Sequence, residues 1–271
     1  MTIRFRNRMT LIFFIVALSC LLLGTFFSLY QYLTGGLVLP DVFIKTDSKN
    51  FLFSYNPLYV FLGIFFMNIY VCITTLIIYH SFEKTQAPDI VFFLLFLAAL
   101  LCDTTRILVP AFNLSGTYSL FLVKVGNVNL FARLLAPLAL MGNTTMSNED
   151  FRQSADRNCI ILIVTALFFS EIIPLNTALI LPNFCISYGY VSAIRGFCFV
   201  TCAVAAIALF NTNRKNEYRQ TMTIGFILLC IGYTLIFYCY NIALLASGVI
   251  MMSSGTFLYL NEVHKHYLWI D

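Results

Sequence analysis

The sequence predicts an all-α integral membrane protein, in which residues 1–271 form one bundle of eight transmembrane helices. Three observations predict this fold class. Hydrophobic residues make up 60% of the chain and charged residues only 10%, with a mean hydropathy of +0.87, whereas a soluble domain carries about 25% charged residues. The apolar residues form runs long enough to cross a bilayer. The connections between these runs are short.

Apolar runs of spanning length define the predicted helices in order. They cover residues 9–33, 54–80, 88–110, 117–142, 157–181, 188–210, 220–239 and 242–262. The first run follows three arginines, as in a signal peptide, but it continues for about 25 residues, so we expect an uncleaved helix. Pro88 opens the third run and Pro110 closes it, and Pro182 closes the fifth.

The last two helices come from one apolar stretch, residues 220–261, which is far too long for a single span. The weak polar break YCYN (238–241) is where we divide it. A bundle of seven helices is the alternative, if the first helix is removed or this division is wrong.

The distribution of basic residues predicts the orientation. With the N-terminus inside, ten of the 16 Lys and Arg residues lie on the inner side, two on the outer side and four within helices. The inner ten are Arg4, Arg6, Arg8, Lys84, Arg152, Arg157, Arg214, Lys215, Arg219 and Lys265, and the outer two are Lys45 and Lys49. Basic loops stay in the cytoplasm. We therefore expect a multi-pass protein of the plasma (cell inner) membrane with both termini cytoplasmic.

Ionisable residues within the predicted helices are the candidates for function, because charges inside a membrane are costly. Five of them fall at a similar depth in the outer half: Asp103, Arg106, Lys124, Glu171 and Arg195. Asp103 and Arg106 lie one turn apart and can pair. Glu171 can pair with Lys124 or Arg195, and one cation then remains. An unmatched buried cation requires an anion, water or a ligand.

Two further helical positions extend this set. Asn127 follows Lys124 on the same face and joins the outer candidates. Asn129 and Arg133 lie on roughly the opposite face of the same helix and form an inner-side pair of polar candidates. Pro137 and Pro174, both inside predicted helices, permit kinks of the kind that accompany binding cavities. The sequence therefore predicts a polar, net cationic pocket that opens outward and accepts an anionic or zwitterionic small molecule.

A purely structural interpretation of the same charges is also open. Lys124 and Arg195 can extend their side chains toward the headgroups, and Asp103 with Arg106 can be a neutral pair that fixes helix packing. The small residues of the last two helices, among them Gly225, Gly232 and Gly255, favour close packing within the chain over dimerisation.

The sequence contains no enzyme signature. The nine cysteines form neither a disulfide framework nor a CxxC zinc site. The three histidines lie at predicted cytoplasmic helix ends, and no phosphate-binding or dinucleotide-binding loop is present. We therefore expect no metal, cofactor or catalytic residue, although an enzyme acting on lipid with Asp103 or Glu171 as base stays open. The net charge of +4 concerns membrane orientation and predicts no nucleic-acid partner.

The layout resembles the multi-helix sensor regions of bacterial histidine kinases and nucleotide cyclases. The resemblance rests on eight short-looped helices, an outward polar cluster that includes DTTR (103–106), and a last helix that continues into the cytoplasm through NEVHKHYLWID (261–271). It implies a sensory or ligand-binding module. Because such proteins carry an output domain and this sequence stops at Asp271, we expect it to signal through a cytoplasmic partner protein or to be a truncated receptor.

Two other functions remain open at this stage. A small-anion transporter or channel subunit is compatible with the buried charges and helical prolines, although the polar residues are concentrated in the outer half. A structural membrane protein of an assembly is the third possibility, and such a protein would show no measurable binding of small molecules.

Overall fold

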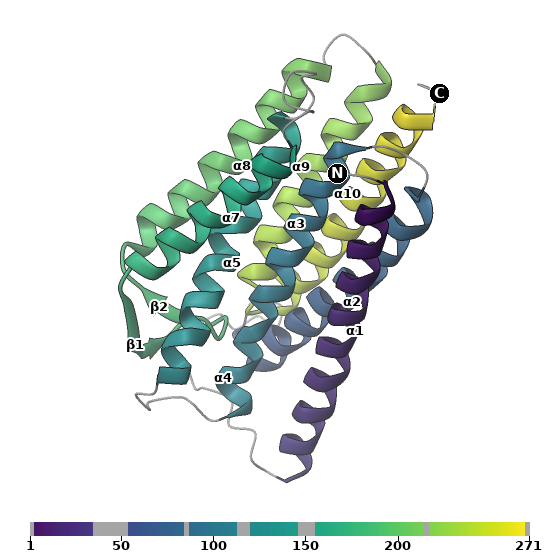
Figure 1. Cartoon of the computed structure of the whole chain (residues 1–271). Coiled ribbons are helices and arrows are strands. Elements are labelled where there is room, and N and C mark those ends of the chain that lie inside the picture. The colour runs from purple at the N-terminus through teal and green to yellow at the C-terminus, as the bar shows by residue number, and fades with distance from the viewer. Residues whose placement is uncertain are drawn as a thin grey trace.

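The computed structural model describes residues 3–34, 54–83, 87–112, 120–145, 155–213 and 217–268. Figure 1 shows one bundle of long helices that run roughly along a common axis, with the N- and C-termini at the same end. In chain order the elements are α1 (Ile3–Leu33), α2 (Pro57–Ser81), α3 (Pro88–Asp103), η2 (Thr104–Ile107), α4 (Leu108–Ala111), α5 (Leu120–Thr145), α7 (Ala155–Ile172), β1 (Leu175–Ile180), β2 (Ile186–Tyr188), α8 (Val191–Asn213), α9 (Glu217–Phe237) and α10 (Ile242–Leu268).

Within the described part of the chain, seven helices are long and apolar enough to cross a membrane. They are α1, α2, the continuous run Pro88–Ala111 formed by α3, η2 and α4, then α5, α8, α9 and α10. The expectation of a multi-pass helical membrane protein is thereby confirmed. The remaining long helix, α7, has 18 residues and includes Asp156, Arg157 and Glu171, so its length is marginal for a span of about 20 residues.

Local sequence explains where several helices begin and end. Asn56 caps α2, because its side chain accepts a hydrogen bond from the backbone N–H of Leu58 at 2.9 Å, and Pro57 occupies the first helical position. Asn241 caps α10 in the same way through the N–H of Leu244 at 2.8 Å. The predicted break at YCYN is therefore a true turn between two helices, which confirms that division of the last apolar stretch.

A short β-hairpin replaces the end of the helix predicted over 157–181, so that helix and the all-α description were wrong here. Helix α7 ends at Ile172, two residues before Pro174, because proline lacks the backbone N–H and disfavours a helical residue before it. Strand β1 then pairs antiparallel with β2, with Leu175 opposite Tyr188 and an irregular register before Ile180. Pro174 accordingly lies outside any helix, whereas Pro137 lies within α5 as expected.

The core lies between the central helices, and the first helix lies at the edge. Helices α2, α3, α5, α8, α9 and α10 all contribute side chains to one continuous apolar cluster. Of α1, only Arg6, Thr10, Ala17 and Ser28 are buried, and the helix lies along the outside of α2 (Figure 1). Most of its surface therefore faces the surroundings of the bundle.

Several basic residues behind the predicted orientation lie outside the described residues. These are Lys45, Lys49, Lys84, Arg152, Arg214 and Lys215. Among the described ones, Arg6 donates to the carbonyl oxygen of Phe82, which follows α2, so the start of α1 lies beside the end of α2. The ring of Phe82 also packs against His264 of α10.

Candidate functional site

Asp103 and Arg106 form a buried ion pair inside the bundle. Their Oδ2 and Nη2 atoms are 3.4 Å apart, and Arg106 is only 1% exposed. The arginine also donates from Nη1 to the backbone carbonyl oxygens of Asn183, at 3.4 Å, and of Phe237, at 3.2 Å. The pairing expected from the sequence is confirmed. The guanidinium also links α3 and η2 to the β-hairpin turn and to the end of α9.

The turn of the β-hairpin packs against the bundle next to this pair, where the Asn183 carbonyl oxygen accepts a hydrogen bond from Arg106. Asn183 donates from its side-chain amide to the carbonyl oxygen of Phe237 at 3.2 Å, beside the bond from Arg106. Phe184 is fully buried, and its φ of 64° is unusual for a residue with a side chain. It packs with Val60 and Ile64 of α2 and with Ile107. The hairpin turn therefore closes the end of the bundle opposite the termini.

Arg133 occupies a cage of aromatic rings next to the ion pair. Its guanidinium donates to the hydroxyls of Tyr233, at 3.3 Å, and Tyr238, at 2.8 Å. Its Cζ atom lies 3.8 Å from the centroid of the Phe237 ring, and the Cζ of Arg106 lies 5.2 Å from the same ring. Because an aromatic face attracts a cation, this ring is shared between two buried guanidiniums.

The separate inner-side location predicted for Asn129 and Arg133 was wrong. Asn129 accepts a hydrogen bond from the hydroxyl of Thr105, at 2.9 Å, immediately before Arg106. Arg133 shares the Phe237 ring with Arg106. Both residues thus belong to the cluster of Asp103 and Arg106. The physical reason is the reach of the arginine side chain, which carries its charge several ångströms from its backbone.

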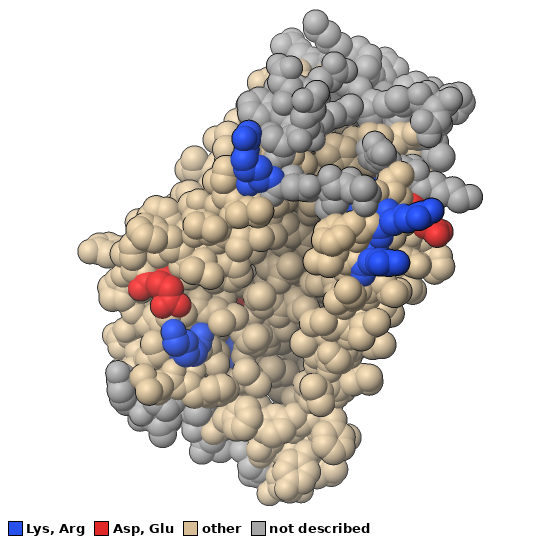
Figure 2. Space-filling model, viewed as in Figure 1, with Lys and Arg blue, Asp and Glu red and all other residues tan. Residues whose placement is uncertain are grey.

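Lys124, Asn127 and Glu171 form a second group on the surface, apart from the buried cluster. The Nζ of Lys124 is 3.9 Å from Oε1 of Glu171, and the side chains are 72% and 51% exposed. Asn127 donates to the other carboxylate oxygen at 3.0 Å. Figure 2 shows an acidic and a basic side chain side by side over the ends of α7 and α5 that adjoin the β-hairpin. The five outer charges therefore do not share one pocket.

Arg195 lies at the surface beside the buried cluster. It is exposed on α8, and its Cζ lies 5.5 Å from the centroid of the Tyr238 ring. The Cζ of buried Arg133 is 4.9 Å from that same centroid. Tyr238 is itself half-buried. The ring of Tyr238 is therefore close to both a surface guanidinium and an interior one.

The cluster carries an excess of positive charge. Within the described ranges, neither Arg133 nor Arg195 has a carboxylate oxygen within 4.0 Å, whereas Arg106 has Asp103. Several buried polar atoms there lack a hydrogen-bond partner: both carboxylate oxygens of Asp103 and the Nε atoms of Arg106 and Arg133. Buried polar groups are normally hydrogen-bonded, so this arrangement has unused capacity to bind a polar group.

The sequence pattern missed the residues that surround these arginines. Asn183 lies in what was predicted as a loop, and Tyr233, Phe237 and Tyr238 lie in or beside an apolar run. The one sequence signal near Tyr238 is the polar break YCYN. The sequence of a membrane helix does not indicate which cation an aromatic side chain contacts. These contacts can therefore be identified only from the tertiary structure.

Cys185, in the hairpin turn, should be chemically inert in the folded protein. Burial raises the pKa of its thiol to about 12, despite the opposing effect of the Arg106 guanidinium. Because the thiolate is the reactive form, maleimide should not label Cys185 between pH 7 and 9 until the protein is denatured. Ala178→Cys, at an exposed position of β1, provides the matched reactive thiol. Equal labelling rates at both positions in the native state would show that the turn is not buried.

Among the described residues, no group of three or more His, Cys, Asp or Glu side chains could hold a metal ion. Comparisons with protein-family models, with curated proteins and with solved structures gave no significant match. The geometry of the buried cluster is therefore the basis for the function proposed below.

Proposed function

We propose that the chain crosses the plasma membrane eight times, with both termini in the cytoplasm. Both termini lie at one end of the bundle, which an even number of passes requires, and α7 runs from that end toward the β-hairpin (Figure 1). The same end carries Arg4, Arg6 and Arg8 of α1, Arg157 of α7 and Lys265 of α10. Basic residues of this kind favour the cytoplasmic side. The β-hairpin and the arginine cluster then lie in the outer half.

We further propose that the protein is a membrane sensory module, which binds an anionic or zwitterionic small molecule at the outer arginine cluster. The observation that carries this proposal is that Arg133 and Arg195 contact one Tyr238 ring, and that among the described residues neither has a carboxylate oxygen within 4.0 Å. Guanidinium groups bind carboxylate and phosphate through paired, charge-assisted hydrogen bonds. The exposed Arg195 would meet the ligand first, and Arg133 provides the interior charge.

The position of Tyr238 supports signalling through a cytoplasmic partner protein. Tyr238 directly follows α9 and lies in the turn that leads into α10. Helix α10 then runs for 27 residues to the opposite end of the bundle. A ligand that shifts Tyr238 would therefore act on a helix that extends to the cytoplasmic end. Such signalling requires that the α9–α10 turn adopts two conformations. The ligand must bind one of these conformations more tightly than the other.

Thermal unfolding of the purified protein with small-molecule probes tests this proposal. We would titrate phosphate, sulfate, glutamate and glycine betaine. We expect at least one of them to raise Tm in a saturable manner. Arg195→Gln should weaken that binding by about tenfold or more, since a hydrogen bond to a charged group contributes roughly 1.5–3 kcal/mol.

Lys124→Gln is the matched control, because Lys124 is also an exposed outer cation but pairs with Glu171. It should bind the probe as the wild type does. Stabilisation that is identical in both variants, or absent with every probe, would contradict the ligand site. Flux of the stabilising anion through proteoliposomes would favour the transporter instead, because a sensor binds its ligand without moving it across the membrane.

A further inference from the structure

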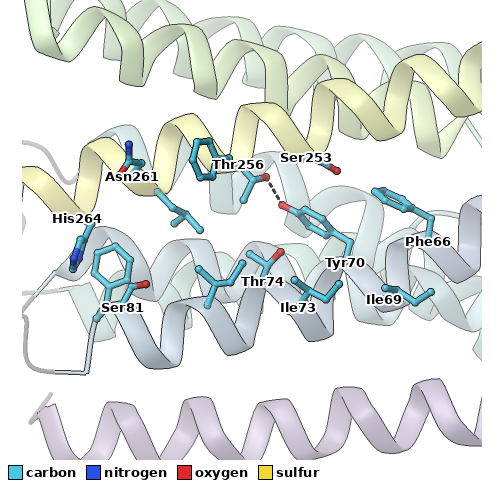
Figure 3. Close-up of a pocket in the computed structure, with 14 residues that line it drawn as sticks. Phe66, Ile69, Tyr70, Ile73, Thr74, Ser81, Ser253, Thr256, Asn261 and His264 are labelled. Carbon is cyan, nitrogen blue, oxygen red and sulfur yellow. Dashed lines mark hydrogen bonds between the residues drawn. The ribbon is translucent and has the colours of Figure 1, made fainter.

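A long groove separates α2 from α10 on the lipid-facing side of the bundle. Its volume is about 400 Å³, and its walls are mostly apolar side chains such as Phe66, Ile73 and Phe257. Figure 3 shows Phe66 and Ile73 on the α2 side of this groove, with α1 on the far side of α2. The hydroxyls of Tyr70 and Thr256 meet across the groove at 2.6 Å and satisfy each other. The middle of the groove therefore offers a largely apolar surface.

The groove is elongated, as a binding surface for a hydrocarbon chain must be. It extends along α2 from Phe66 to Ser81, which is about 22 Å at 1.5 Å per residue. Apolar side chains from both helices line most of this length, so an extended acyl chain can remain in apolar contact along the groove.

The groove is most polar at one end. Ser81, Asn261 and His264 line that end, and Nδ1 of His264 is buried without a hydrogen-bond partner. Phe82 also lines it, and the Phe82 carbonyl oxygen accepts a hydrogen bond from Arg6. The groove thus runs from an apolar interior to a polar opening at the end of the bundle that carries the termini, as the chain of a membrane lipid runs to its headgroup.

The charges around the polar opening favour a negative headgroup. Arg4 and Arg8 are exposed on either side of Arg6, and Lys265 follows His264. The acids of the same segments are Glu83 and Glu262, of which Glu262 pairs with Lys265 at 2.9 Å. In Figure 2, basic side chains gather over the start of α1 with one acidic side chain beside them. Basic residues at the membrane surface attract anionic lipids.

We propose that this groove is a binding site for one anionic glycerophospholipid. One acyl chain lies in the groove along α2 and α10, over the buried contact of Tyr70 with Thr256, and the phosphate headgroup lies against His264 and the first turns of α1. The site is distinct from the arginine cluster, which lies at the opposite end of the bundle. It therefore does not depend on the sensory function proposed above.

Native mass spectrometry of the full chain tests the site directly. The purified protein would be incubated with equal amounts of palmitoyl-oleoyl phosphatidylglycerol and of the phosphatidylcholine with the same acyl chains. We expect one retained lipid per chain, with the anionic lipid preferred by about tenfold because of the nearby basic residues. Ser253→Phe, which places a ring in the groove, should abolish retention. Ser254→Phe is the matched control, because Ser254 is an exposed neighbour that does not line the groove.

A second pair of variants tests the headgroup. Ser81→Asp should reduce the preference for phosphatidylglycerol by at least about threefold, since it adds a negative charge at the polar opening, whereas Ser81→Asn should retain that preference. Equal retention by Ser253→Phe and Ser254→Phe would overturn the groove as the site. Equal binding of both lipids by the wild type would overturn the anionic headgroup. A dimer of the chain that Ser253→Phe disrupts would show instead that a second copy covers the groove.

Discussion

Replacing Asp103 with asparagine should be among the most destabilising single substitutions in the bundle. The carboxylate is the one acid that pairs with Arg106 within the described ranges, and the guanidinium is only 1% exposed. Its removal leaves a buried cation that contacts two backbone carbonyl oxygens and the ring of Phe237 but no described carboxylate. Breaking a buried pair by removing one member typically costs 3–5 kcal/mol. We expect a loss of about that size in the free energy of unfolding, measured by reversible denaturation in mixed micelles.

A double variant separates the ion pair from other effects of this substitution. Arg106→Met should also destabilise the protein, because it leaves Asp103 buried and unpaired. The combination of Asp103→Asn with Arg106→Met removes both charges, so it should cost clearly less than the sum of the single variants. Additive losses would show that the two side chains contribute independently and that their contact has little energetic weight.

The exposed pair of Lys124 and Glu171 is the matched control for this experiment. Its charges are of the same kind, but the side chains are 72% and 51% exposed. Exposed ion pairs contribute about 0–1 kcal/mol. Glu171→Gln should therefore change the free energy of unfolding by less than about 1 kcal/mol. A comparable loss from Glu171→Gln and Asp103→Asn would mean that burial does not distinguish the two pairs.

Substitution of Gly255 by alanine should separate α9 from α10. A Cβ atom on Gly255 would lie 2.5 Å from the backbone nitrogen of Leu229 and 2.7 Å from the carbonyl oxygen of Gly225. These are backbone atoms, so they cannot move aside without displacing a helix. A Cβ atom added to Gly225 would likewise lie 2.8 Å from the backbone nitrogen of Tyr259 in α10. Overpacking of this kind costs about 1–3 kcal/mol, and we expect Gly255→Ala to lower the stability by that amount.

Gly196→Ala on α8 is the appropriate comparison, because an added Cβ there meets no heavy atom within 4 Å. Alanine has a higher helix propensity than glycine by about 1 kcal/mol, so this variant should be at least as stable as the wild type. The same Gly→Ala substitution should therefore lower the stability at position 255 and should not lower it at position 196. If Gly255→Ala also leaves the protein as stable as the wild type, then α9 and α10 do not pack as closely as the structure indicates.

The sequence predicted the helical elements well wherever an apolar run met a clear boundary signal. The break at YCYN divides α9 from α10 as predicted, with Asn241 capping α10, and the helix predicted over 54–80 is α2, Pro57–Ser81. It failed between 173 and 181, where the apolar residues of β1 extended the hydrophobic run past Pro174. Hydropathy measures affinity for an apolar environment and does not distinguish a helix from a strand over so few residues.

Some of the candidate residues are exposed and others are buried, and their depth along each helix does not predict which. Lys124, Glu171 and Arg133 all lie within helices, but the first two point outward and the third is enclosed by Tyr233, Phe237 and Tyr238. Rotation of each helix about its own axis decides this difference. That rotation is set by packing against neighbours, such as the close approach of Gly225 and Gly255, which a single sequence does not specify.

The sequence by itself determined that this is a multi-pass helical membrane protein and that Asp103 and Arg106 can pair, because hydrophobic run length and the spacing of one helical turn are local properties. The tertiary structure alone decided that Arg133 joins this pair, that Lys124 and Glu171 leave it, and that a β-hairpin turn closes over it. These outcomes depend on contacts between residues up to 131 positions apart, such as Arg106 with the carbonyl oxygen of Phe237. Such contacts form only when the whole bundle packs together.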